Sequence, residues 1–227
     1  VILDFFQEKR RPVPLESIPS CLREAVVAVE DKRFYSHWGI DLVRIPGLVM
    51  SMVRHAGDIK GTSTITQQLA RSMFLTPERS VARKLKEMAL AIRIEQTYTK
   101  DEILEMYFNQ IYFGEGAYGV DAAAKVFFGK QVQGLTLPEC AMLAGLPRNP
   151  RDYSPRRDPD RALRRRNLVL AQMLSARFIT RSQYEAASEA PVGVTKTRYN
   201  AQEAPYFMEM VRLYLDERYG SNQIYEG

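Results

Sequence analysis

The stretch TKDEILEMYFNQIYF, residues 99–113, decides the fold class. It begins with a capping box, in which Thr99 and Glu102 satisfy backbone N–H groups at the start of a helix. Apolar residues then recur at helical spacing from Ile103 to Phe113, which is the pattern of an amphipathic helix. The stretch therefore predicts a helix that begins at its threonine.

The same signals recur along the chain and predict a protein built from helices. Residues 136–139 and 180–183 have the form of capping boxes, and Asp158 with Pro159 resembles an N-cap followed by proline at the first helical position, starting a helix through Arg177. Further helices are expected over residues 21–30 (with Ser17 and Ser20 as caps), 63–71, 80–98, 140–146, 184–190 and 205–219. No stretch shows the sustained alternation of a half-buried sheet, so the predicted fold class is all-α.

Composition and charge limit the classes of function. With 227 residues, the chain allows one generous domain or two small lobes. Its 32 Lys and Arg against 27 Asp and Glu give a charge of +5, which suits anionic partners such as phosphates, nucleic acid or an acidic membrane. Cys21 and Cys140 are too few for a disulfide framework or a zinc site, and their oxidation state stays open. The most apolar run, residues 47–53, is far shorter than the roughly 20 residues of a membrane span.

Residues 41–56 differ from the other predicted helices. Their apolar side chains are spread round nearly the whole helical circumference, which indicates a helix that is buried or pressed into something apolar. Two interpretations remain open. The segment is a core helix, or it lies in a membrane interface where Arg44 and Arg54 meet lipid phosphates.

Two carboxylate clusters are candidates for chemistry. Glu30 and Asp31 close a predicted helix, and paired carboxylates are typical of proton transfer, although a solvated helix end has the same pattern. Arg83 and Lys84 stand four and three residues before Glu87 and share its helical face. They form either a surface ion pair or a carboxylate surrounded by phosphate-binding cations.

A third cluster carries uncharged polar groups. Thr64, Gln67, Gln68 and Arg71 fall on one face of a helix that begins near Ser63. Hydroxyls and amides along one stripe suit a neutral polyhydroxyl ligand, and a solvated helix face is the alternative.

In this order, the clusters resemble the motifs of the peptidoglycan glycosyltransferase domain, glycosyltransferase family 51, of class A penicillin-binding proteins and monofunctional transglycosylases. The first three motifs, E-D-x-x-F-x-x-H-x-G, G-G-S-T-I-T-Q-Q and R-K-x-x-E, are similar to residues 30–39, 61–68 and 83–87. Residues 105–130 and 139–155 resemble the fourth and fifth. The chain departs from the family pattern with Thr62 for the second glycine, Arg71 where Lys is common and Phe127 where Tyr is common.

The resemblance implies a lysozyme-like all-α fold with a larger head lobe and a smaller membrane-associated jaw lobe that contains residues 41–56. It implies a glycosyltransferase domain over residues 1–190 and a connector over residues 191–227 towards an absent transpeptidase domain. The expected location is the extracytoplasmic face of the bacterial cytoplasmic membrane. There an N-terminal transmembrane helix, absent here, anchors the parent protein.

The implied reaction polymerises lipid II into β-1,4-linked glycan strands with release of undecaprenyl diphosphate, by an inverting single displacement. Glu30 and Glu87 are the implied catalytic residues. The implied substrate-binding residues are Asp31, Phe34, His37, Ser63, Thr64, Gln68, Arg71, Arg83, Lys84 and Asn109.

The resemblance also implies the partners of the domain. They are lipid II, a lipid-linked glycan strand, the membrane surface, phosphoglycolipid inhibitors such as moenomycin and a transpeptidase domain in the parent chain, with no nucleic acid. A divalent cation, Mg or Mn, is the one cofactor left open, its ligands are unknown, and no organic cofactor is expected.

Two other classes of protein stay open. A lysozyme-like enzyme would cleave finished peptidoglycan, but Arg83 and Lys84 beside Glu87 would then have no purpose. A non-catalytic membrane or scaffold module would dock through residues 41–56 and the arginine-rich stretch 151–166. Binding without turnover distinguishes the second from an enzyme.

Overall fold

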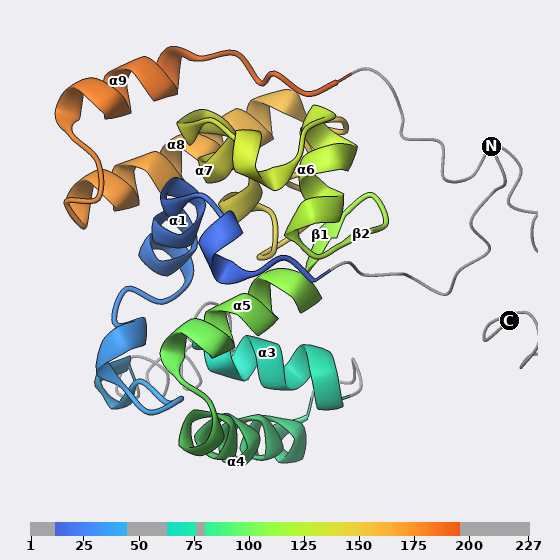
Figure 1. Ribbon diagram of the computed structural model, residues 1–227, viewed down its shortest axis with the longest axis vertical. Helices are drawn as coiled ribbons and strands as arrows, with labels where there is room; N and C mark the ends of the chain where they lie inside the picture. The colour runs from blue at the N-terminus through green and yellow to red at the C-terminus, as the bar shows by residue number, and fades with distance from the viewer. Residues whose placement is uncertain (1–11, 45–62, 76–79, 196–227) are drawn as a thin grey trace, which may run out of the picture. The chain divides into compact units, whose positions relative to one another are not determined.

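The computed structural model describes residues 12–44, 63–75 and 80–195, which are mostly helical, as predicted (Figure 1). The α-helices are α1 (Ser20–Glu30), α3 (Ile65–Phe74), α4 (Val81–Thr97), α5 (Lys100–Gln110), α6 (Val120–Phe128), α7 (Leu137–Gly145), α8 (Pro159–Ser175) and α9 (Arg181–Glu189). Short 3-10 helices span Leu15–Ser17, Phe34–Ser36, Leu42–Arg44 and Val132–Gly134. The helix predicted over 205–219 and most of the segment 41–56 lie outside the described residues. No described helix is long and apolar enough to cross a membrane.

The helix starts follow the capping signals of the sequence closely. Thr99, Thr136 and Thr180 form the predicted capping boxes at the starts of α5, α7 and α9. The Asp158 carboxylate accepts from the Arg161 N–H at the start of α8, as predicted. The expected serine cap of α1 is wrong. Pro19 precedes that helix, which has no side-chain cap.

The helix predicted to run to Phe113 ends earlier, at Gln110. The chain then forms an antiparallel hairpin of two short strands, β1 (Tyr112–Gly114) and β2 (Ala117–Tyr118). The reversal passes through positive φ angles at residues 114–116, of 99°, 52° and 77°, and two of these three residues are glycines. Strands of three and two residues are too short to produce a visible alternation, which explains why the sequence pattern did not reveal them.

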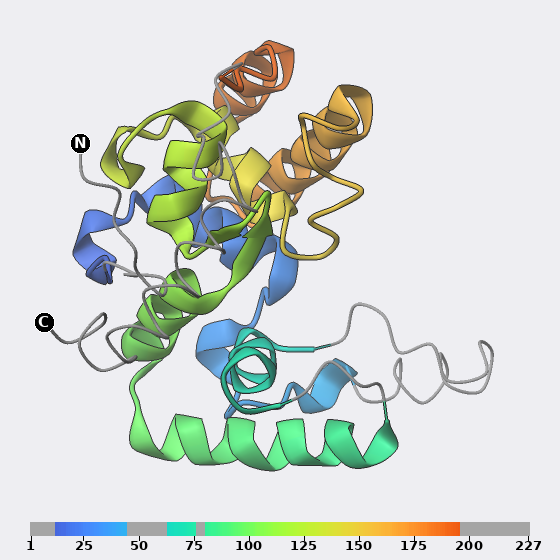
Figure 2. The ribbon, with the colours of Figure 1, turned by 90° about the vertical axis from the view of Figure 1, so that its right-hand side faces the viewer.

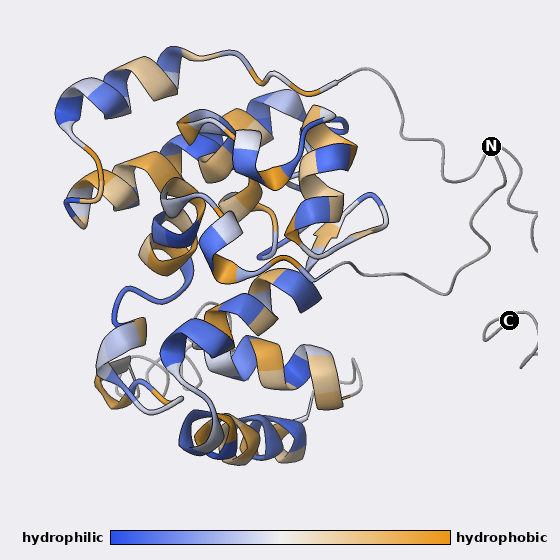
Figure 3. Cartoon of the chain, in the orientation of Figure 1, coloured by the Kyte–Doolittle hydropathy of each residue, from blue (hydrophilic) through white to orange (hydrophobic). Residues whose placement is uncertain are grey.

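Two groups of helices pack within the compact unit formed by residues 12–195. In one group, α1 packs against α7 and α8, and α9 packs against α8. In the other, α3 packs against α4 and α5. Figures 1 and 2 show α4 and α3 below and α6 to α9 above, with α5 between them. Each helix carries both hydrophilic and hydrophobic patches, as amphipathic packing requires (Figure 3).

The core includes side chains from both groups of helices. Leu22 and Val26 of α1, Leu69 of α3 and Phe108 of α5 are fully buried in one hydrophobic cluster. The two groups therefore share a continuous core, and the carboxyl end of α1 lies between them.

A disulfide joins Cys21 of α1 to Cys140 of α7, a pairing that the sequence left open. Their Cα atoms are 6.0 Å apart, and 119 residues separate them along the chain. A crosslink over so long a loop lowers the conformational entropy of the unfolded chain substantially.

Reduction of this disulfide should lower the free energy of unfolding by roughly 2–5 kcal/mol, the usual cost of losing a long-range crosslink. Urea denaturation of the wild-type chain with and without dithiothreitol measures the difference. The double variant Cys21→Ala/Cys140→Ala is the control and should not respond to the reductant. Identical wild-type midpoints in both conditions would contradict the prediction.

Candidate active site

Glu30 is the last residue of α1, at the point where three helices meet. Gln68 of α3 donates from Nε2 to Glu30 Oε2 at 2.9 Å. On the other side, Arg165 of α8 places Nη2 3.8 Å from Glu30 Oε1, and the Glu30 side chain is 11% exposed. One carboxylate oxygen thus accepts a hydrogen bond, and the other has a cation within ion-pair distance.

Asp31, the next residue, is fully buried and anchors the end of α1 to the start of α3. Its Oδ2 accepts from the Ile65 N–H at 3.1 Å and lies 2.8 Å from His37 Nε2. Because His37 Nδ1 accepts from the Gly39 N–H, Nε2 carries the ring proton and donates to Asp31. The negative charge of Asp31 also faces the N-terminal end of the α3 dipole, where it is stabilising.

Three first-motif residues predicted to contact substrate are buried, namely Asp31, Phe34 and His37. Asp31 and Phe34 have no exposed surface, and His37 is buried. The Lys100 ammonium lies 4.6 Å from the centre of the Phe34 ring. In this arrangement, the three side chains hold the segment after Glu30 in place, and contact with substrate stays a prediction for all three.

Glu87 of α4 is 1% exposed and is surrounded by cations. Lys84 Nζ lies 3.0 Å from Oε2, while Arg83 Nη1 and Arg71 Nη1 lie 3.4 Å and 3.9 Å from Oε1. This confirms that Arg83 and Lys84 share the face of Glu87. Three cations around one carboxylate leave an excess of positive charge, which suits an anionic ligand.

Lys84 links this cluster to the start of α3. Its ammonium donates to Ser63 Oγ at 2.7 Å and to Gln67 Oε1 at 3.0 Å, as well as to Glu87. Burial lowers the pKa of Lys84, and the hydrogen bond and charge of Glu87 oppose this effect. Residues predicted from separate motifs thus form a continuous set of two groups that share α3: Glu30 with Gln68, and Glu87 with Arg71, Arg83, Lys84 and Ser63, which lies just before α3.

Two predicted substrate-binding residues are occupied by main-chain contacts instead. Thr64 caps α3, accepting from the Gln67 N–H and donating to the Gly39 carbonyl at 2.6 Å. The Asn109 amide accepts from the Val13 N–H and donates to the Val13 and Glu105 carbonyls. The structure does not bring these two side chains into the continuous set, and contact with substrate stays a prediction for both.

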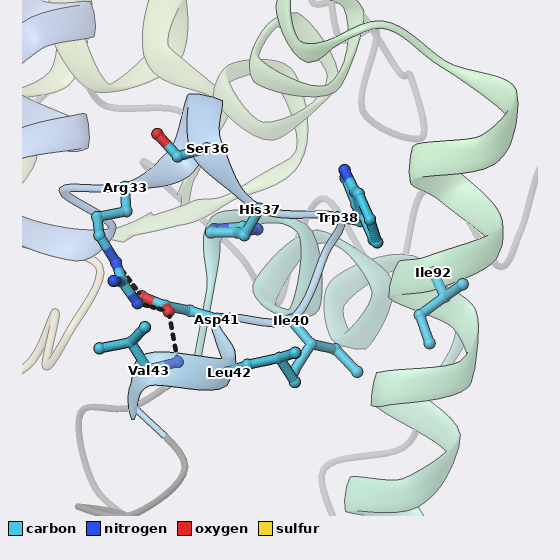
Figure 4. Close-up of a pocket in the computed structure, with 9 residues that line it drawn as sticks. All are labelled: Arg33, Ser36, His37, Trp38, Ile40, Asp41, Leu42, Val43 and Ile92. Atoms are coloured by element: carbon cyan, nitrogen blue, oxygen red, sulfur yellow. Dashed lines mark hydrogen bonds and ion pairs between the residues drawn. The ribbon is translucent and has the colours of Figure 1, made fainter.

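An apolar hollow of about 400 Å³ lies beside the first motif (Figure 4). It is lined by Arg33, Ser36, His37, Trp38, Ile40, Asp41, Leu42, Val43 and Ile92. Trp38 is 85% exposed, and Leu42 and Val43 at the start of the 41–56 segment are 68% and 70% exposed. Leu42 and Val43 are therefore not core residues, and their side chains are exposed for contact with something apolar.

Sequence reasoning missed two residues near Glu30. Tyr107 of α5 is fully buried, and its hydroxyl has no hydrogen-bond partner among the described residues. Burial raises the pKa of Tyr107 well above its usual value, and the charge of Glu30 adds to the effect. Arg165 lies in the arginine-rich stretch 151–166, which the sequence suggested only as a docking surface. Its spacing from Ala162 and Val169, both on the buried face of α8, is the signal that could have revealed it.

A site for a metal ion is not found among the residues that the structure describes. The donor set also fits a divalent cation poorly, because three cations already surround the Glu87 carboxylate. We therefore derive no catalytic step from a metal ion.

Comparisons with known proteins agree with the motifs. The family described as Transglycosylase matches residues 1–174. The chain is 49% identical to penicillin-binding protein 1A of Aquifex aeolicus over 94% of its own length and 29% of the relative. It is 47% identical to penicillin-binding protein 1A of Escherichia coli over 100% of its own length and 27% of the relative. The crystal structure of penicillin-binding protein 1A from Haemophilus influenzae matches with a TM-score of 0.55 and 28% identity, covering 94% of this chain and 22% of that one.

Replacement of Asp31 by Ala should destabilise the fold by about 3 kcal/mol, since it leaves two buried donors, the Ile65 N–H and His37 Nε2–H, without their charged acceptor. Urea denaturation followed by circular dichroism measures the loss. Lys32→Ala, at the exposed neighbouring position, is the control. An unchanged unfolding midpoint for Asp31→Ala would show that the anchor is dispensable.

Proposed function

Since the chain belongs to the transglycosylase family, as a peptidoglycan glycosyltransferase domain of the class A penicillin-binding protein type, we propose that it polymerises lipid II into β-1,4-linked glycan strands. Undecaprenyl diphosphate is the leaving group. The observation that carries this proposal is the buried Glu87 with Arg71, Arg83 and Lys84 around it, close to the Gln68 that holds Glu30. A site of this kind combines a carboxylate for proton transfer with cations for a diphosphate.

Glu30 acts as the base that removes the proton of the acceptor 4-hydroxyl. Inversion in one displacement needs a base on one face of the sugar and assistance to the leaving group on the other, as two carboxylates provide in inverting glycosidases. Glu30 is partly exposed, and Gln68 fixes its Oε2. This support leaves the carboxylate oriented for a hydroxyl that approaches from the surface.

Arg71, Arg83 and Lys84 stabilise the negative charge that grows on the diphosphate as the glycosidic bond breaks. Arg71 is the most exposed of the three, which suits direct contact with a phosphate. Glu87 keeps the three cations together, and it assists departure of the diphosphate or stabilises the oxocarbenium-like transition state.

The rival cleaving enzyme is less consistent with this arrangement. A lysozyme-like hydrolase acts on a neutral glycosidic linkage and gains nothing from three cations around its second carboxylate. The excess of positive charge next to Glu30 favours a substrate with a diphosphate.

The proposed place of action is the extracytoplasmic surface of the cytoplasmic membrane. The exposed Trp38, Leu42 and Val43 support contact of this region with lipid, since lipid II is itself membrane-bound. The relatives are more than three times as long as the part that this chain matches. We propose that the parent protein also carries a membrane anchor and a transpeptidase domain, on the extracytoplasmic side.

Replacement of Glu30 by Gln should lower the rate of polymerisation by at least about a hundredfold, because the variant keeps the shape of the side chain but cannot accept a proton. Labelled lipid II, incubated with each protein in detergent with and without Mg²⁺, is separated by gel electrophoresis. Glu24→Gln, the same change on the same helix, is the control and should give a wild-type ladder. Wild-type turnover by Glu30→Gln would exclude Glu30 as the base.

Replacement of Arg71 by Ala should weaken binding of a moenomycin-type phosphoglycolipid by about tenfold or more, the usual cost of one charge-assisted contact. Fluorescence anisotropy of a labelled inhibitor measures the affinity, with Arg93→Ala on the exposed side of α4 as the control. Equal affinity of Arg71→Ala and wild type would exclude a contact of Arg71 with the phosphate.

A further inference from the structure

Arg165 is a buried cation that no part of the proposed mechanism uses. Its side chain is 6% exposed, and its Nη2 lies 3.8 Å from Glu30 Oε1. Gln68 donates to the other oxygen, Oε2, at 2.9 Å. Two elements that are far apart in the sequence, α3 and α8, thus place an amide and a cation beside the two oxygens of one carboxylate.

The guanidinium is fixed by contacts that do not involve Glu30. Its Nε donates to the Gly145 carbonyl at 3.1 Å, at the end of α7, where the negative end of the helix dipole favours a cation. Its Cζ lies 5.3 Å from the centre of the Tyr153 ring, within the range of a cation–π contact. Arg165 is therefore in place before any substrate binds.

Residue 145 shows how closely this side chain is packed. A Cβ atom added to Gly145 would lie 2.9 Å from Arg165 Cγ, closer than side-chain atoms normally approach. Glycine is needed here because the arginine stem crosses the helix end. The position of the guanidinium is consequently built into α7 as well as α8.

We propose that Arg165 is a positioning residue that keeps the Glu30 carboxylate charged and oriented for the acceptor hydroxyl. This inference rests on the proposed function of Glu30 as the base. Only an ionised carboxylate can accept the proton, and a cation within about 4 Å favours the ionised form.

The other neighbours of Glu30 that the structure describes differ in charge or in pairing from Arg165. Gln68 is uncharged, Arg71 is paired with Glu87, and Tyr107 of α5 is a neutral phenol whose burial raises its pKa. Asp31 is a negatively charged neighbour, and its carboxylate already accepts hydrogen bonds from the Ile65 N–H and His37. Burial lowers the pKa of Arg165, and the negative charge of Glu30 opposes this effect. The positive charge of Arg148 lowers the pKa of Arg165 further.

The test is the pH dependence of kcat/KM for lipid II polymerisation by the full chain. In Arg165→Met, the acid limb should move to higher pH by about one unit or more, since the base then loses the cation that favours its charged form. Arg165→Lys retains the charge and should shift by less than half as much. Arg164→Met is the matched control, because it removes the same charge at an exposed neighbouring position and should keep the wild-type limb. An unshifted acid limb in Arg165→Met would overturn the proposal.

A second measurement does not depend on turnover. The ¹³C carboxyl signal of Glu30, assigned by its absence in Glu30→Gln, is followed against pH in wild type and in Arg165→Met. A titration that moves to higher pH in the variant supports the contact between Arg165 and Glu30, even if neither protein makes polymer. The absence of polymer would count against the proposed function alone. An unmoved titration overturns the Arg165 proposal even if wild type is active.

If Arg165→Met does not fold, the same titration of the Glu30 carboxyl signal is measured in Gly145→Ala. The added methyl group displaces the arginine stem while its charge is retained. The Glu30 titration should then move in the same direction by a smaller amount. A wild-type titration in a folded Gly145→Ala with a displaced arginine would overturn the proposal.

Discussion

The buried carboxylate of Asp31 is the interaction on which the arrangement of the site depends. It joins the end of α1 to the first N–H of α3 and accepts a hydrogen bond from His37 Nε2. A fully buried charge is costly unless strong donors surround it, so these contacts can form only when α1 and α3 meet in one geometry. That geometry places Glu30 next to Gln68, since Glu30 directly precedes Asp31 and Gln68 lies three residues after Ile65, about one turn along α3.

The two catalytic candidates lie in different electrostatic surroundings, although both are glutamates. Glu30 has an amide on one oxygen and a buried guanidinium near the other. Glu87 has three cations and almost no exposed surface. A carboxylate with a partly open side suits transfer of a proton, whereas a carboxylate that neutralises only part of a cationic cluster leaves that cluster able to bind an anion.

Local signals in the sequence predicted most of the helices. Threonine with glutamate or glutamine three residues later needs no long-range information to start a helix, and Thr99, Thr136 and Thr180 all do so. Helical spacing also places Arg83 and Lys84 on the face of Glu87. Glu30 and Gln68 are assigned to one site only through the resemblance to the family.

What the sequence could not reveal depends on burial and on contacts far apart in the chain. A motif marks Asp31 and Phe34 in the same way as Glu30, but only the packing shows that they are buried. Cys21 and Cys140 carry no local signal of their pairing over 119 residues. The hairpin depends on a three-residue turn that is invisible to periodicity.

The two adjacent arginines of α8 show why charge patterns in sequence mislead. Arg165 and Arg166 lie on the buried face of the helix, although a stretch so rich in arginine predicts a solvated surface. Burying a guanidinium costs free energy unless its donors find acceptors in fixed places. Arg166 finds them in the carbonyls of Ser188, Ala190 and Pro191, and so fixes the end of α9. Arg165 finds the Gly145 carbonyl and, at longer range, Glu30. One turn of α8 therefore contacts both the end of α9 and the catalytic candidate Glu30. A substitution in this turn can act on either one through packing alone.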